Sequence, residues 1–245
     1  MRFCLLAALL LCAAVASQPA RSADEKIKTG FVDKTFKNAD GTTSPYVVFV
    51  PKDYDGTKEY PTMLFLHGSG ETKGGTKMPA DVGIATAIRK REKDFPFIVV
   101  IPQSEKRTWG AASDDGKRAL AMLDAVQKEY KTDAKRQYLT GLSMGGFGTW
   151  SIAAAHPDRF AAIVPICGGG NVKDAEKIKD IPTWVFHGDA DTAVKVDRSR
   201  EMVEALKKAD GKPKYDEYPG VGHNSWDKAY GTDELYKWLL SQKKK

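Results

Sequence analysis

Short apolar runs alternate with longer amphipathic stretches along most of the chain. The runs at 46–50, 62–66 and 97–101 are rich in Val, Ile and Phe and are bounded by Pro, Gly or Asp, which predicts β-strands. Residues 138–139 are expected to lead into the next turn as a strand, and further strands are expected at 161–166, 182–186 and 215–218. Apolar residues at helical spacing and polar helix starts predict helices at 113–131, 146–156, 197–208 and 226–240. Strands separated by helices indicate an α/β fold with a largely parallel sheet covered on both faces.

The N-terminal residues do not follow this alternation. Met1 and Arg2 give a short positive start, and 3–15 is almost wholly apolar before the small residues Ala16 and Ser17. This pattern predicts a secretory signal peptide at 1–17, with cleavage between 16 and 23. The run is short for a bilayer span, so an uncleaved anchor is the less favoured alternative. We therefore expect a secreted or periplasmic protein without stable membrane insertion after signal cleavage.

The rest of the chain is expected to form one catalytic domain at 28–242, followed by a basic tail at 243–245. Of three cysteines only Cys167 lies outside the signal region, so no internal disulfide is expected. Cys167 ends an apolar strand, which favours an inert buried thiol over a nucleophile. The net charge of +6 is spread over basic residues interleaved with acids, so no nucleic-acid partner is expected.

The segment Gly141-Leu142-Ser143-Met144-Gly145 carries the strongest chemical signal. It lies where a predicted strand runs directly into a helix, which is the layout of a nucleophile elbow that exposes a serine hydroxyl on a strained turn. The two glycines let the strand and the helix approach each other closely. Ser143 is therefore the predicted nucleophile.

A serine nucleophile needs a base, and the chain has four histidines. His223 fits best, because it lies in a glycine-rich loop after the last strand, where active groups of parallel sheets are found. His156 is predicted to close the helix after the elbow, while His67 and His187 precede glycines at strand ends and are expected to brace loops. No second ligand stands near them at metal spacing, so neither a metal nor a cofactor is expected.

The base needs a carboxylate, and the loop after the run at 182–186 offers Asp189 and Asp191. We favour Asp191 and keep Asp189 as the alternative; the chain order is then serine, acid, histidine, as in α/β-hydrolases. The oxyanion formed on attack needs preorganised N–H donors. The backbone N–H of Met144 and that of Ser69, in the glycine-rich segment after His67, are the predicted donors.

These segments, running in order from about residue 45 to 230, resemble the compact prolyl-oligopeptidase-like or phospholipase/carboxylesterase branch of the α/β-hydrolases. The resemblance implies the α/β-hydrolase fold without an obvious lid, with the acid at Asp191, the base at His223 and an oxyanion amide at Ser69. Two departures are visible. Lys195 stands where a proline is common, and the loop around Trp109 is shorter than expected.

Short loops and an open site favour a small-molecule or polymer-linked ester, so the prediction is a secreted carboxylesterase that forms an acyl-enzyme at Ser143. Trp109 and Trp226 are candidate pocket walls, with ordinary packing as the alternative, whereas the tryptophans inside regular elements are expected in the core: Trp150, Trp184 and Trp238. A serine peptidase, an acyltransferase and, least favoured, a non-catalytic binding protein remain alternatives.

Overall fold

A computed structural model describes residues 27–244. The predicted signal peptide at 1–17, its cleavage sites and the last residue of the basic tail lie outside the described residues. Within 27–244, no helix is both long and apolar enough to cross a membrane. At the C-terminus, the backbone N–H of Lys244 donates to the carbonyl of Lys135.

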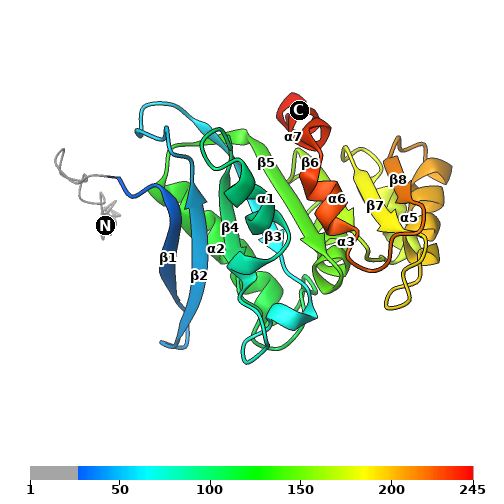
Figure 1. Ribbon diagram of the computed structural model, residues 1–245, viewed down its shortest axis with the longest axis horizontal. Helices are drawn as coiled ribbons and strands as arrows, with labels where there is room; N and C mark the ends of the chain where they lie inside the picture. The colour runs from blue at the N-terminus through cyan, green and yellow to red at the C-terminus, as the bar shows by residue number, and fades with distance from the viewer. Residues whose placement is uncertain (1–26, 245) are drawn as a thin grey trace, which may run out of the picture.

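One eight-stranded sheet forms the centre of the structure, in the order β1-β2-β4-β3-β5-β6-β7-β8 (Figure 1). The strands are β1 (Gly30–Lys37), β2 (Thr43–Val50), β3 (Tyr60–Leu66), β4 (Ile98–Pro102), β5 (Thr132–Leu142), β6 (Ala162–Ile166), β7 (Trp184–Gly188) and β8 (Lys214–Tyr218). β2 is antiparallel to both β1 and β4. The other six strands, β3 to β8, run parallel to one another. The predicted mostly parallel sheet is confirmed.

Helices cover both faces of the sheet, as the alternating pattern predicts. One face carries α2 (Asp114–Glu129), α3 (Met144–Ala155), α4 (Ala175–Ile178) and α5 (Asp197–Lys208), and the other carries α1 (Ile84–Lys90), α6 (Trp226–Gly231) and α7 (Asp233–Ser241). Successive side chains of a strand point to opposite faces. In β3, Leu64 and Leu66 accordingly join the first core, whereas Met63 and Phe65 join the second.

Several elements differ from the sequence prediction. β1 was not predicted, because it is a partly exposed edge strand whose charged and polar residues interrupt the apolar signal. α1 was also missed, since its seven residues are too few to show a clear helical period. The single helix expected at 226–240 is two helices, separated where Gly231 ends α6 and Thr232 takes an extended backbone. β5 begins at Thr132, six residues before the predicted strand, through a largely polar segment.

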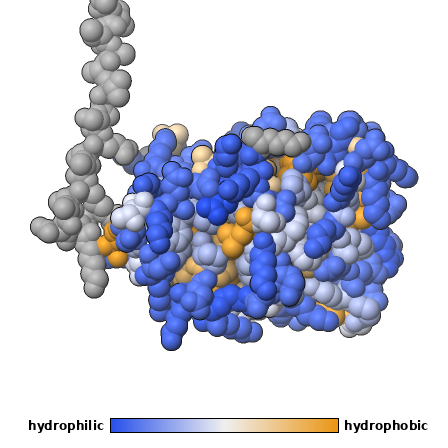
Figure 2. Space-filling model, turned by 90° about the horizontal axis from the view of Figure 1, so that it is seen from above, coloured by the Kyte–Doolittle hydropathy of each residue, from blue (hydrophilic) through white to orange (hydrophobic). Residues whose placement is uncertain are grey.

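Hydrophilic side chains cover most of the face seen from above, with small hydrophobic patches between them (Figure 2). Three short 3₁₀ helices, η1 (Ser69–Glu71), η2 (Pro79–Asp81) and η3 (Val172–Asp174), lie in connecting loops. η1 lies in the loop after β3, and η3 lies in the loop after β6. Such loops at the carboxyl ends of parallel strands are where α/β folds place their ligand sites.

Candidate active site

Ser143 occupies the sharp turn between β5 and α3. Its backbone has φ 53° and ψ −117°, a strained conformation for a residue with a side chain. The flanking glycines are required sterically. A Cβ on Gly141 would lie 2.3 Å from the carbonyl oxygen of Gly145, and one on Gly145 would lie 1.9 Å from that of Leu66. The structure therefore has the strand–turn–helix geometry that the Gly-x-Ser-x-Gly segment predicts.

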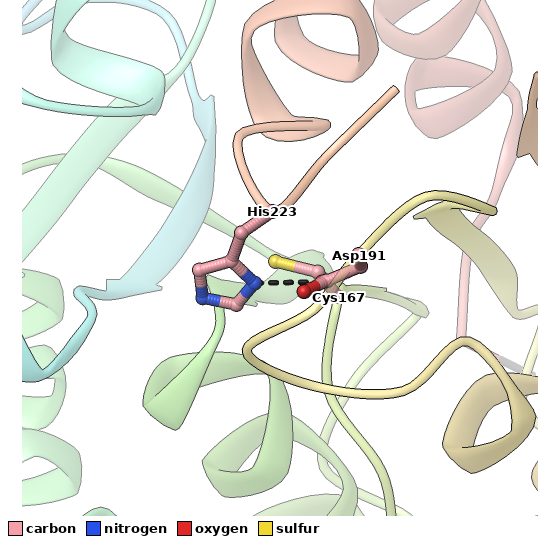
Figure 3. A group of neighbouring side chains, drawn as sticks. All are labelled: Cys167, Asp191 and His223. Atoms are coloured by element: carbon pink, nitrogen blue, oxygen red, sulfur yellow. Dashed lines mark hydrogen bonds and ion pairs between the residues drawn. The ribbon is translucent and has the colours of Figure 1, made fainter. Parts of the chain in front are cut away.

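Three predicted side chains form one hydrogen-bonded relay. The His223 Nε2 lies 2.9 Å from the Ser143 Oγ, and the His223 Nδ1 lies 2.7 Å from the Asp191 Oδ2. Figure 3 shows the His223 ring directed at the Asp191 carboxylate. Because an ionised carboxylate only accepts hydrogen bonds, Nδ1 carries the proton and the unprotonated Nε2 can accept the serine proton. The geometry therefore suits a serine activated by general-base catalysis.

The Asp191 carboxylate is buried and receives four N–H contacts. Its Oδ1 accepts from the backbone N–H groups of Ala193 and Val194 at 2.8 and 2.9 Å, and its Oδ2 is shared by the side chains of His223 and His187. Burial raises the pKa of Asp191, but the hydrogen bonds from His223 and Val194 outweigh it and hold the pKa below its usual value. The carboxylate is thus kept ionised and oriented.

Asp189, the alternative acid, is exposed and bonds to the backbone of the loop that carries His223, whereas Asp191 bonds to the His223 ring. Its Oδ1 accepts the backbone N–H of Gly220 at 2.7 Å, and the neighbouring N–H of Ala190 donates to the carbonyl of Val221. These bonds join the Asp191 loop to the loop that carries His223. Asp189 therefore has a place in holding the two loops together.

His187 is a contact of the relay that sequence reasoning missed. Its Nε2 lies 2.9 Å from the carbonyl oxygen of Val194 and 3.1 Å from the Asp191 Oδ2, while its Nδ1 lies 2.7 Å from the Ser199 Oγ. A carbonyl oxygen can only accept, so Nε2 carries a hydrogen and shares it with Asp191. The sequence predicted a loop-bracing role, and its His-Gly-Asp-Ala-Asp spacing alone did not show contact with the carboxylate.

The two candidate oxyanion donors come from two segments close to Ser143. Met144 is the first residue of α3, where backbone N–H groups have no intrahelical acceptor. Ser69 begins η1, and the preceding Gly68 packs so closely that a Cβ there would lie 3.6 Å from the Ser143 Cβ. Backbone donors at these positions can be aimed at a developing oxyanion beside the serine.

His67 holds the Ser69 loop in place. Its Nε2 accepts the backbone N–H of Ser104 at 2.9 Å, so its Nδ1 carries the proton and donates to the Gly68 carbonyl at 2.6 Å. The Trp109 indole N–H donates to the His67 carbonyl at 2.9 Å. Burial lowers the pKa of His67 to about 4, so the ring is neutral at physiological pH. One buried imidazole thus links the loops that follow β3 and β4.

The two tryptophans predicted as pocket walls have different surroundings. Trp109 is buried and lines a cavity beside Met144, and the rings of Trp226 and His223 form a T-shaped pair with centroids 5.4 Å apart. Trp184 lies in the core and Trp238 packs against it, whereas the buried Trp150 also reaches the cavity. His156 caps the C-terminus of α3, where the sequence predicted it.

Cys167 lies directly behind the relay, and its Sγ is close to the side chains of Asp191 and His223 (Figure 3). The three ligand atoms lie within 4.8 Å of one another, a spacing that a metal ion could bridge. Burial raises the pKa of the Cys167 thiol to about 12, so the thiol stays protonated, and the Asp191 and His223 atoms already bond to each other. These properties suit a relay better than a metal site.

Comparison with known proteins identifies the family of this chain. Residues 41–238 match the Esterase family model, described as "Putative esterase". The chain belongs to this esterase family. Its fold is that of the α/β-hydrolases: a solved structure titled as a thermostable esterase superposes with a TM-score of 0.74 at 34% identity, covering 87% of this chain and 63% of that one.

Two curated relatives are also similar to this chain. The bifunctional acetylxylan esterase/xylanase XynS20E of Neocallimastix patriciarum is 35% identical over 39% of this chain and 15% of the relative. The probable feruloyl esterase C of Aspergillus terreus is 23% identical over 68% of this chain and 62% of the relative. The chain therefore spans less than two thirds of the length of either relative.

Proposed function

We propose that this protein is a serine carboxylic ester hydrolase in which Ser143 is the nucleophile, His223 the general base and Asp191 the acid that orients it. The observation that carries the proposal is the continuous relay from the Ser143 Oγ to the His223 Nε2 at 2.9 Å and from the His223 Nδ1 to Asp191 at 2.7 Å. Membership of the esterase family supports ester bonds as the target.

In the first half-reaction, the Ser143 Oγ attacks the ester carbonyl while the His223 Nε2 takes the hydroxyl proton. The carbonyl oxygen becomes an oxyanion, which the backbone N–H groups of Met144 and Ser69 stabilise. The imidazolium then gives its proton to the departing alkoxide, which leaves as the alcohol, and the acyl group remains on Ser143.

In the second half-reaction, His223 takes a proton from water, which attacks the acyl-enzyme at the same carbonyl carbon. Collapse of this second oxyanion releases the carboxylic acid, and the proton returns to the Ser143 oxygen. Asp191 stays ionised throughout, because its hydrogen bonds favour the carboxylate over the protonated form.

The proposed substrate is a small or polymer-linked ester, and the proposed location is outside the cytoplasm. The names of the curated relatives refer to acetylxylan and feruloyl esters, which supports an ester attached to a carbohydrate polymer. The location rests on the positive and apolar residues at 1–17.

The test is hydrolysis of p-nitrophenyl esters from acetate to laurate by the mature protein and by Ser143→Ala. We expect activity in the wild type, a burst of p-nitrophenol when deacylation is slower than acylation, and loss of turnover in the variant. A fluorophosphonate probe should label the wild type and leave Ser143→Ala unlabelled. Ester hydrolysis that persists in Ser143→Ala would overturn the assignment of the nucleophile.

The same preparation separates the alternatives. Cleavage of peptide amides without cleavage of simple esters would favour a peptidase, and diversion of the acyl group to added alcohols at the expense of acid would favour an acyltransferase. An unlabelled Ser143 with no turnover of any ester would favour a binding protein. Each of these outcomes contradicts ester hydrolysis as the main activity.

A further inference from the structure

A cavity of about 700 Å³ reaches Met144, the residue after the proposed nucleophile. Its walls come from the loop after β4, the first two turns of α3, the loop after β6 and the start of α5. Met144, a proposed oxyanion donor, lies on the wall, so a substrate held at Ser143 can extend into this space. A volume of several hundred Å³ is typical of pockets for small ligands.

Two apolar side chains of the cavity are exposed rather than packed. Phe147 is 37% and Val172 is 44% exposed, and both line the cavity. They are two of the three large hydrophobic residues that are exposed among the described residues. Their exposure inside a concave site favours contact with the apolar body of a ligand.

The charges of the cavity are paired except for one. Arg198 pairs with Glu201 at 3.2 Å, and Asp174 pairs with Lys177 at 2.7 Å, so both acidic groups of the lining are neutralised. Arg107 also lines the cavity, and its guanidinium has no ion pair or hydrogen bond within residues 27–244. The unpaired charge facing the ligand is therefore positive.

The unpaired guanidinium indicates the kind of ligand that the cavity would bind. A guanidinium can only donate hydrogen bonds, so Arg107 calls for a ligand with acceptor oxygens, and its charge favours an anion.

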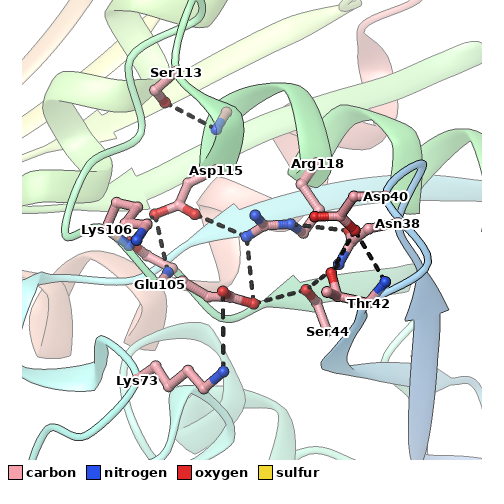
Figure 4. Close-up of polar contacts among 12 residues, drawn as sticks. Asn38, Asp40, Thr42, Ser44, Lys73, Glu105, Lys106, Ser113, Asp115 and Arg118 are labelled. Atoms are coloured by element: carbon pink, nitrogen blue, oxygen red, sulfur yellow. Dashed lines mark hydrogen bonds and ion pairs between the residues drawn. The ribbon is translucent and has the colours of Figure 1, made fainter.

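The loop that presents Arg107 is fixed from below by a buried carboxylate (Figure 4). The Asp115 Oδ2 accepts the Ser104 hydroxyl and the backbone N–H groups of Glu105 and Lys106 at 2.6, 2.9 and 2.7 Å, while its Oδ1 accepts from Arg118 at 2.8 Å.

The residue after this anchored segment has an unusual backbone. Arg107 takes φ 55°, a left-handed conformation that is uncommon outside glycine. The backbone N–H of Thr108, the next residue, is held by the Ser104 hydroxyl at 3.2 Å. The backbone around Arg107 is therefore held on both sides, and the guanidinium projects from a fixed point on the rim.

The position of His223 decides which half of the ester the cavity receives. The departing alcohol must lie next to the His223 Nε2, since it takes its proton from there. No residue of the loop at 219–226, which carries His223, lines the cavity. The alcohol thus leaves on the His223 side, and the acyl group remains for the cavity on the Met144 side.

We propose that this cavity is an acyl-binding site selective for acyl groups with an apolar body and a terminal carboxylate, which Arg107 recognises. The favoured substrates are half-esters of dicarboxylic acids, and the inference rests on the proposed ester hydrolysis. The apolar body contacts Phe147 and Val172, and the carboxylate accepts from the guanidinium at the rim.

The test compares kcat/KM for p-nitrophenyl hemiadipate with that for its neutral analogue, methyl p-nitrophenyl adipate, after subtraction of the reaction without enzyme. We expect the wild type to prefer the anionic ester by about fivefold at low salt, the upper range for an exposed charge pair. The preference should shrink toward unity in 1 M NaCl, because salt screens exposed charges. Arg107→Gln should remove it and Arg107→Lys should retain part of it.

The matched control is Lys106→Gln, which removes the same charge one residue earlier from a side chain outside the cavity lining. Its anionic preference should equal that of the wild type. A wild type that prefers the neutral ester, or equal ratios in Arg107→Gln and wild type, would overturn the anion site while leaving ester hydrolysis intact. Turnover of neither ester, with Ser143 unlabelled by fluorophosphonate, would overturn both proposals.

A second substrate pair tests the acyl assignment. 4-Acetoxybenzoate places the carboxylate on the alcohol side, and its methyl ester is the neutral analogue. Arg107→Gln should leave the ratio for this pair unchanged. A loss of preference confined to this pair would place the anion on the alcohol side and overturn the assignment of the cavity to the acyl group.

Discussion

Replacement of Asp191 by Asn is the sharpest test of the relay. The Asn Oδ1 can still accept the backbone N–H groups of Ala193 and Val194, so the loop keeps its two bonds of 2.8 and 2.9 Å. The Asn Nδ2 then takes the place of the oxygen that faces His223 and His187. An amide nitrogen donates, so it can pair with His223 only if Nδ1 gives up its hydrogen.

The consequence is the wrong tautomer of the base. With its hydrogen on Nε2, His223 meets the Ser143 hydroxyl as a donor and cannot accept its proton. The corresponding substitution in serine proteases costs about 10⁴ in kcat, which is the magnitude expected here. A factor of 10⁴ is about 5 kcal/mol of transition-state stabilisation.

The assay is steady-state hydrolysis of p-nitrophenyl acetate at pH 8, with a urea unfolding curve to show that each variant is folded. The matched control is Asp189→Asn, which also removes one carboxylate from the same loop but can keep the bond to the Gly220 N–H. We expect the control to remain within about tenfold of wild type. A larger loss of kcat in Asp189→Asn than in Asp191→Asn would refute the relay as described.

Three further predictions follow from the surroundings of the relay. Gly145→Ala should abolish fluorophosphonate labelling or soluble expression, because the added Cβ would lie 1.9 Å from the Leu66 carbonyl oxygen. A variant that is labelled as strongly as the wild type would contradict this close packing. Cys167 should resist iodoacetamide at pH 8 until the protein is unfolded, since burial raises its thiol pKa to about 12; rapid alkylation of the native protein, read by mass spectrometry, would show an accessible thiolate. Burial lowers the pKa of His67 from 6.5 to about 4, so the folded protein binds this proton less readily than the unfolded chain does. The free energy of unfolding should therefore fall by about 3 kcal/mol on this account as the pH drops from above 6.5 to 4. Denaturant unfolding at pH 7 and pH 4 should show a smaller decrease in the free energy of unfolding for His67→Gln than for the wild type. Equal decreases in the two proteins would show that His67 does not cause the acid destabilisation.

Local sequence was sufficient to predict the elements with strong patterns. The buried parallel strands are rich in Val, Ile and Phe, which the sequence shows directly. The Gly-x-Ser-x-Gly segment predicts a strained turn, and its glycines are required because a Cβ at Gly141 or Gly145 would lie only 2.3 or 1.9 Å from a backbone carbonyl oxygen. The edge strand β1 and the short helix α1 were missed, since their pairing and packing partners lie far along the chain and leave little local periodicity.

Most residues of the candidate site could be predicted from residue types and their order along the chain. The contacts between these residues depend on the tertiary structure. The order of Ser143, the Asp189/Asp191 loop and His223 follows from the sequence. Which aspartate meets His223 depends on how two loops pair across β7 and β8, and only folding brings His187 against the same carboxylate. The unpaired charge of Arg107 likewise follows only from knowing which acids are already neutralised by neighbours. The sequence determines which reactive groups the protein has and in what order they follow. The hydrogen bonds and charge pairs between distant loops form only when the folded sheet brings the ends of its strands together.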